Sequence, residues 1–169
     1  MTKSTPTPRR SRRATIYHGS CHCGRVVFEV KGRLLRVNEC NCSICAKKGH
    51  LHWIVPRATF RLLTPTTALA TYTFNTGVAK HHFCRVCGIA AFYIPRSDPD
   101  KIDVNVRCLA DVDPTRLCID TFDGQNWETA YGRYAALPTR TQSDITSLSS
   151  RARKKPGDRL KVSQRFKKE

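Results

Sequence analysis

The chain has 169 residues, which is enough for one domain and leaves little room for a second. It contains no apolar run long enough to cross a membrane and no apolar N-terminal region typical of a secretory signal, so we expect neither. Its net charge is +17: residues 1–18 hold five Lys and Arg and no acid, and residues 139–169 hold ten against three acids.

In chain order, residues 1–15 predict a disordered basic arm, and residues 138–169 predict a disordered basic tail. Between them, alternating apolar and β-branched stretches separated by turn signals predict about eight short strands. Residues 46–50 are expected to be a basic loop, and residues 127–137 have helical propensity interrupted by Gly132. The expected domain, residues 16–137, is therefore mainly β. These strands come from nine candidate stretches: residues 25–30, 34–37, 51–55, 60–63, 69–74, 78–83, 89–94, 102–106 and 118–122.

The two basic ends allow two interpretations. Clustered Lys and Arg bind nucleic acid or other polyanions by releasing counterions, but solvated arms with no dedicated partner have the same composition. Because no membrane segment is expected, we predict a cytoplasmic location, with the nucleus as an alternative and no membrane partner.

Nine cysteines in a chain without a predicted secretory signal argue for metal ligands rather than for disulfides. Their spacing supports this interpretation, because closely spaced thiols are typical of metal sites and two cysteines separated by one residue rarely form a disulfide. They form a pair, a triad and a second pair, followed by two single residues: Cys21 and Cys23; Cys40, Cys42 and Cys45; Cys84 and Cys87; then Cys108 and Cys118.

The two pairs form one plausible set. Gly24 follows the first pair directly and Gly88 follows the second, as expected of tight metal knuckles in which backbone N–H groups turn toward the sulfurs. Four thiolates from two such knuckles make a closed structural zinc site. The alternative is that these cysteines are reduced and packed in the core.

The triad leaves one tetrahedral position of a zinc ion free, so it is also a candidate for a catalytic site. From the residues alone, a fourth ligand stays open. It is either water or a substrate thiol, which would make the site catalytic, or a protein ligand that closes a second structural zinc. The candidate protein ligands are His50, His52, Cys108 and Cys118.

Other side chains give weaker signals. Ser43 lies inside the triad loop, where it can orient an adduct or only cap the turn. Lys47, Lys48 and Lys80 are either ordinary surface lysines or candidates for binding the carboxylates of a peptide thiol. Five acids lie in loop or surface patterns, and we expect them to be solvated rather than catalytic: Asp98, Asp100, Asp103, Asp111 and Asp113.

The order of these motifs resembles the glutathione-dependent formaldehyde-activating enzyme family, which includes centromere protein V. The likeness covers roughly residues 17–135 and has all seven clustered thiols in register. The pieces that carry it are Gly19-Ser20-Cys21-His22-Cys23-Gly24, Cys40-Asn41-Cys42-Ser43-Ile44-Cys45 and Phe83-Cys84-Arg85-Val86-Cys87-Gly88. Two further stretches look like the centromere protein V branch: Tyr72-Thr73-Phe74-Asn75-Thr76 and Phe122-Asp123-Gly124-Gln125-Asn126-Trp127-Glu128.

The resemblance implies a mainly β, Mss4-like fold, also called a β-tent. It also implies two zinc ions: a structural one on Cys21, Cys23, Cys84 and Cys87, and an open one on Cys40, Cys42 and Cys45. Family enzymes join formaldehyde to glutathione as S-hydroxymethylglutathione, the activity of a carbon–sulfur lyase. We therefore expect a thiol such as glutathione as partner, for which Ser43, Lys47 and Lys80 are the candidate contacts. The alternative is a non-enzymatic module of the centromere protein V kind, which binds nucleic acid or cytoskeletal polyanions through the basic ends.

Overall fold

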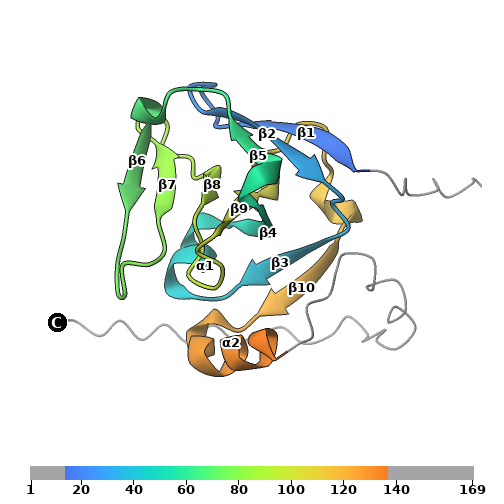
Figure 1. Ribbon diagram of the computed structural model, residues 1–169, viewed down its shortest axis with the longest axis vertical. Helices are drawn as coiled ribbons and strands as arrows, with labels where there is room; N and C mark the ends of the chain where they lie inside the picture. Colours follow the sequence, from blue (N-terminus) through green and yellow to red (C-terminus); the bar gives the residue numbers. More distant parts are fainter. Residues whose placement is uncertain (1–13, 137–169) are drawn as a thin grey trace, which may run out of the picture. The chain divides into compact units, whose positions relative to one another are not determined.

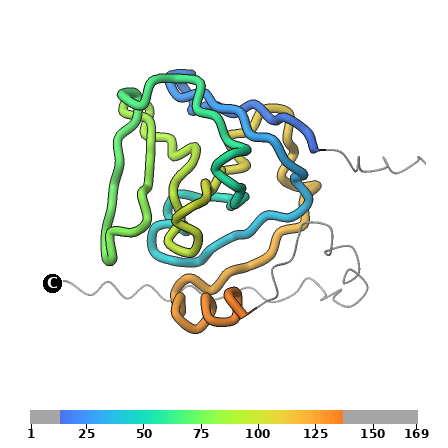
Figure 2. The backbone as a smooth tube through the Cα atoms, in the orientation of Figure 1, coloured from blue at the N-terminus to red at the C-terminus, as the bar shows by residue number. Residues whose placement is uncertain are grey.

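A computed structural model describes residues 14–136 (Figures 1 and 2). The predictions made for the basic arm and tail fall almost entirely outside these residues. No helix in the described part of the chain is long and apolar enough to span a bilayer.

The described residues form ten strands in three sheets, which confirms the mainly β fold class. The largest sheet has five strands in the order β10-β3-β4-β9-β8, and only its β10–β3 pair is parallel. Its strands are β10 (Cys118–Phe122), β3 (Arg36–Cys40), β4 (Leu51–Pro56), β9 (Lys101–Asn105) and β8 (Phe92–Tyr93).

Two smaller antiparallel sheets complete the strands (Figure 1). One has three strands in the order β1-β2-β5, formed by β1 (Thr15–Ser20), β2 (Val27–Gly32) and β5 (Phe60–Leu62). The other is the hairpin of β6 (Leu69–Tyr72) and β7 (His81–Cys84). The strand β1 was not among the predicted strands, since its sequence, Thr-Ile-Tyr-His-Gly-Ser, has only a short apolar segment and mostly exposed side chains.

The described residues also contain two α-helices and five 3-10 turns, of which η5 and α2 follow the last strand. The helices are α1 (Ser43–Lys48) and α2 (Trp127–Ala135), and α2 lies beside β10 in Figure 1. The prediction of a loop at residues 46–50 is wrong for its first half: α1 continues through Lys48 and stops at Gly49, whose φ of 58° makes it a left-handed helix cap. The turns are η1 (Arg57–Thr59), η2 (Thr66–Ala68), η3 (Val106–Cys108), η4 (Pro114–Arg116) and η5 (Gly124–Asn126).

The two faces of the five-stranded sheet differ in chemistry. On one face, Trp53 pairs with Val104, Val55 pairs with Ile102 and Phe92 pairs with Val104, and all of these side chains are buried in the hydrophobic core. The core continues onto the three-stranded sheet, where the Phe28 ring stacks on Phe60 and meets the edge of Phe92.

The opposite face of this sheet is polar. Because side chains alternate along a strand and directly paired residues share a face, the register places Asn38, His52 and Asn105 on one face, together with Asp103 and Tyr93. This polar face carries the candidate site.

Candidate functional site

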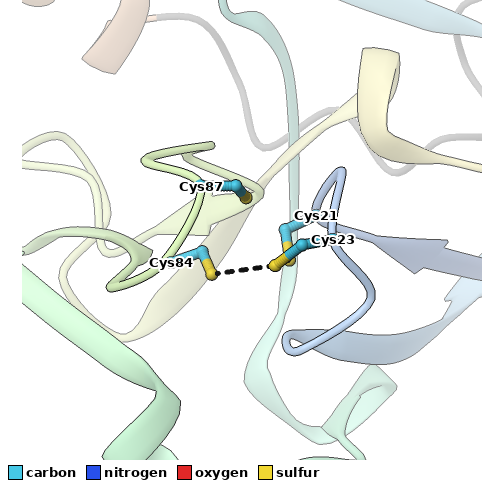
Figure 3. Close-up of side chains that lie close together, drawn as sticks. All are labelled: Cys21, Cys23, Cys84 and Cys87. Atoms are coloured by element: carbon cyan, nitrogen blue, oxygen red, sulfur yellow. Dashed lines mark hydrogen bonds between the residues drawn. The ribbon is translucent and has the colours of Figure 1, made fainter.

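Four cysteines from two distant knuckles meet at one point (Figure 3). Their sulfurs all lie within 4.8 Å of one another, and the Sγ of Cys23 is 3.6 Å from the Sγ of both Cys21 and Cys84, with Cys87 completing the group. Four sulfurs bound tetrahedrally to zinc at about 2.3 Å lie about 3.8 Å apart. The four side chains therefore fit a closed zinc site.

The knuckles are built by backbone geometry close to each cysteine pair. Gly24 and Gly88 have φ of 75° and 74°, a conformation that glycine adopts without strain, and each donates its N–H to the carbonyl of the first cysteine of its knuckle. Val26 N–H points at the Cys21 sulfur over 3.3 Å. Such donors stabilise a thiolate, and backbone hydrogen bonds from Cys87 and Val86 lower the pKa of Cys84.

The triad also converges. Cys40 ends β3, Cys42 precedes the first turn of α1, and Cys45 lies inside α1, so that three thiols from six residues lie within 4.8 Å of one another. Hydrogen bonds with the Cys40 and Cys45 thiols lower the pKa of Cys42, while hydrogen bonds with the Cys40 and Cys42 thiols raise the pKa of Cys45. The cluster therefore favours at least one thiolate, which suits a metal cation.

The turn that follows β10 holds the triad loop in place. The Asn41 side chain donates to Asp123 Oδ1 over 3.0 Å and accepts from the backbone N–H of Gln125 over 3.0 Å. Gly124 passes so close that a Cβ there would lie 2.4 Å from Cys40 Sγ and 2.8 Å from Cys42 Cβ. Glycine at this position is therefore a steric requirement of the site, which sequence spacing did not reveal.

Among residues 14–136, the triad group contains three candidate ligands. All nine cysteines and all six histidines of the chain lie in residues 14–136, and no fourth one joins the triad. Cys118 pairs with Arg36, four residues before the strand position of Cys40, and Cys108 lies near the four-cysteine cluster, where the charges of Cys21 and Cys87 act on it.

A cavity of about 430 Å³ opens over the triad. A volume of this order suits a small-molecule ligand. Its walls come from all three cysteines, the polar face of the five-stranded sheet, the β6–β7 hairpin, the turn η5 and helix α2. The lining includes Cys40, Cys42, Ser43, Cys45, His52, Phe74, Thr76, His81, Tyr93, Arg96, Asp103, Phe122, Gly124, Gln125 and Trp127.

A second polar cluster lies beside the triad, formed by His50, His52 and Asp103, which are 3%, 5% and 1% exposed. His52 Nδ1 is 2.8 Å from Asp103 Oδ2, and His50 Nε2 is 3.5 Å from Asp103 Oδ1. Neither imidazole joins the triad, because its nitrogens do not lie within 4.8 Å of all three sulfurs. The three side chains also form a group that could hold a metal ion.

The prediction that Asp103 is solvated is wrong. Apolar and polar residues alternate in β9 as in a strand with one solvated face, but the polar side of β9 faces buried histidines. The two histidines lower the pKa of Asp103 against the opposing effect of burial, so the group is a buried carboxylate. The prediction is wrong for Asp98 as well, which is buried. Its Oδ1 lies 2.6 Å from Lys101 Nζ, so the lysine replaces solvent as the partner of this carboxylate.

The residues predicted to contact a thiol do not all lie in the cavity wall. Ser43 lines the cavity, whereas Lys47 and Lys80 do not, and Lys80 Nζ donates instead to the carbonyl of Gly77 over 2.7 Å. Among the described lining residues, Arg96 is the single Lys or Arg. Its guanidinium lies 3.7 Å above the Trp127 ring and 2.6 Å from a Glu128 carboxylate oxygen.

Comparison with known proteins agrees with the motif order. The family model described as glutathione-dependent formaldehyde-activating enzyme matches residues 16–123. The chain belongs to this family. A crystal structure of a Rhodobacter sphaeroides protein superimposes with a TM-score of 0.56 and 33% identity, covering 61% of this chain and 99% of that one. The likeness to the centromere protein V branch stays a prediction.

Proposed function

We propose that the chain binds a small thiol such as glutathione at a zinc ion held by Cys40, Cys42 and Cys45, and promotes or carries the adduct of that thiol with an aldehyde. The observation that carries the proposal is a three-cysteine cluster that lines a cavity and has no fourth protein ligand among residues 14–136. Family membership supports glutathione as the thiol and formaldehyde as the aldehyde.

The cysteines fit the metal, and when bound there it would supply the lowered thiol pKa that makes a thiolate nucleophile available near neutral pH. The chain's own residues do the rest. Phe74 and Phe122 give the cavity apolar walls that limit water, and Ser43 and Gln125 offer polar contacts close to the triad. A thiol placed there has its sulfur at the cysteines and its remaining groups along the cavity.

Arg96 is the best placed cation for a carboxylate of a peptide thiol. The Trp127 ring below it fixes the guanidinium plane, and Glu128, which is well exposed, offers a pairing that a ligand carboxylate can replace. Lys47 and Lys80, which lie outside the lining, keep their predicted role only if they act from the rim of the cavity.

The test compares two cysteine variants. Exchange NMR with ¹³C-labelled formaldehyde and glutathione gives the rate of adduct formation above the uncatalysed rate. We expect Cys42→Ser to remove one zinc per chain and to lower the enhancement about 100-fold or more. Cys118→Ser is the control, because Cys118 is an exposed thiol outside both clusters.

Three outcomes separate the possibilities. Loss of zinc and rate in Cys42→Ser, with Cys118→Ser unchanged, supports promotion of the adduct. Zinc-dependent glutathione binding without acceleration supports a carrier. A folded Cys42→Ser protein with wild-type rate and thiol affinity contradicts both. The polyanion-binding alternative concerns residues outside the described part of the chain and stays a prediction, as does the cellular location.

A further inference from the structure

The cavity contains a histidine with an unused nitrogen. His52 lines the cavity together with the three cysteines, and its Nε2 is buried without a hydrogen-bond partner among the described residues. Burying a polar atom without a partner is unfavourable, so its presence in a cavity wall points to a partner that arrives with the ligand.

The other nitrogen of this ring is fixed by the protein. His52 Nδ1 is 2.8 Å from Asp103 Oδ2, and Asp103 is a fully buried carboxylate whose pKa is lowered. A carboxylate only accepts, so Nδ1 carries a proton and donates it. In the neutral ring, the lone pair is therefore on Nε2, and the strand pairing of β4 with β9 holds both residues on one face of the sheet.

The groups packed against this pair are polar, and the charge of Lys48 acts on the neighbouring His50. The His50 ring lies tilted against the His52 ring, with ring centroids 4.5 Å apart, and His50 Nε2 is 3.5 Å from the second carboxylate oxygen of Asp103. The Tyr93 hydroxyl lies 3.4 Å from His52 Nδ1. Burial works to lower the pKa of His52, yet the charge and hydrogen bond of Asp103, with smaller contributions from Cys42 and Glu39, raise it overall. For His50, the effect of burial outweighs that of Asp103, so the pKa of His50 is lowered.

We propose that His52 is the catalytic acid and base of the cavity and that Asp103 is its positioning residue. The inference rests on the proposed function. In the forward direction, Nε2 of His52 accepts the proton of the incoming S–H group, and the sulfur forms a bond to the aldehyde carbon. The carbonyl π pair moves onto oxygen, and Nε2–H then returns the proton to that oxygen. Thiol and aldehyde give the hydroxyalkyl thioether with no other reactant, and the reverse order releases them.

The role of Asp103 follows from the same geometry. It orients the ring, sets the tautomer with the lone pair on Nε2, and stabilises the imidazolium that forms between the two proton transfers, which is how a buried carboxylate supports a catalytic histidine in general. Without this carboxylate, the ring would be free to place its proton on Nε2 and could not accept one from the thiol.

The kinetic test uses His52→Gln in the full chain loaded with zinc, measured by formaldehyde–glutathione exchange NMR. Because general acid–base catalysis contributes about 10²- to 10⁴-fold, we expect the enhancement to fall by that factor while zinc content and glutathione affinity stay within about twofold of wild type. His82→Gln is the control, since His82 bonds Thr71 and does not line the cavity. An unchanged rate in His52→Gln overturns the role of His52 and leaves the proposed function intact.

A spectroscopic test does not depend on activity. ¹⁵N chemical shifts of the imidazole nitrogens in the full chain should show His52 with hydrogen on Nδ1, and Asp103→Asn should shift the population toward hydrogen on Nε2. Because Asp103→Asn removes a buried charge and can impair folding, the wild-type shifts alone already decide the tautomer. Hydrogen on Nε2 in the wild type overturns the proposal. So does a further equivalent of zinc bound to the His50, His52 and Asp103 group.

Failure of the two proposals gives different results. A wild-type protein that neither accelerates the adduct nor binds glutathione in a zinc-dependent way refutes the proposed function and, with it, the role of His52. Zinc-dependent glutathione binding without any acceleration leaves a carrier and overturns the role of His52 alone.

Discussion

Replacing Gly124 by alanine tests whether the turn after β10 holds the three-cysteine site. The new Cβ would lie 2.4 Å from Cys40 Sγ and 2.8 Å from Cys42 Cβ. Non-bonded heavy atoms in packed proteins lie about 3.5–4 Å apart, so the turn or the cysteines have to move by more than about 1 Å. Zinc ligands tolerate deviations of only about 0.2 Å. We therefore expect zinc affinity at the triad to fall about 10- to 100-fold.

The assay follows zinc transfer to a chromogenic chelator in excess. The wild type should release a fast fraction from the triad and a slow fraction from the four-cysteine cluster, and Gly124→Ala should speed up or empty only the fast fraction. Gly132→Ala is the matched control, because a Cβ there meets nothing within 4 Å and alanine favours helix α2 by roughly 1 kcal/mol. A release curve for Gly124→Ala identical to that of the control would refute the reasoning, since it would mean that the turn yields freely.

Three further predictions concern stability and recognition. Cys84→Ser should remove the slowly released zinc and lower the thermal midpoint by tens of degrees or abolish folding, whereas Cys108→Ser, a nearby thiol outside the cluster, should change stability by less than about 2 kcal/mol; circular dichroism melting checks both. Burial first, and then the charge of Lys48, lower the pKa of His81 to about 4 in the folded chain. The unfolded chain, with its histidine pKa near 6.5, then binds more protons, so stability should fall as the pH is lowered from about 6.5 to 4. In urea titrations, His81→Phe should remove about 1–3 kcal/mol of that loss, and an unchanged pH profile would contradict the shift. Arg96→Gln should weaken glutathione binding about tenfold in calorimetry with little loss of stability, while Arg61→Gln, on an exposed pair away from the cavity, should bind like wild type.

The cysteine sites could be predicted from the sequence because the geometry of each cysteine motif is local. Cys40, Cys42 and Cys45 span six residues, and the glycines after each knuckle indicate the backbone turn that brings the thiols together. The likeness of the two knuckles was enough to group Cys21 with Cys84, although 63 positions separate them, and the structure places their sulfurs together.

The cluster of His50, His52 and Asp103 could not be predicted in the same way. His52 and Asp103 meet through the register of two strands, and a shift of one residue in either strand would turn one of them to the opposite face. The sequence showed the alternation of β9 but not which face would meet solvent. A useful signal was nevertheless present, since polar residues alternate in both 50–54 and 102–106, and two such strands paired side by side gather their polar residues on one face.

The two cysteine clusters should contribute differently to folding, because they close chain loops of very different length. A metal between Cys23 and Cys84 ties together positions 61 residues apart, so its binding free energy appears largely as folding free energy. The triad lies within one short loop that Asn41 already anchors to the turn after β10, and a metal there restricts the unfolded chain much less. Loss of the triad metal should therefore leave the fold intact. For the same reason, a fourth ligand of that ion should be able to exchange while the chain stays folded. Under the proposed function, one stabilising ion and one exchangeable ion would let the chain release a thiol adduct without unfolding.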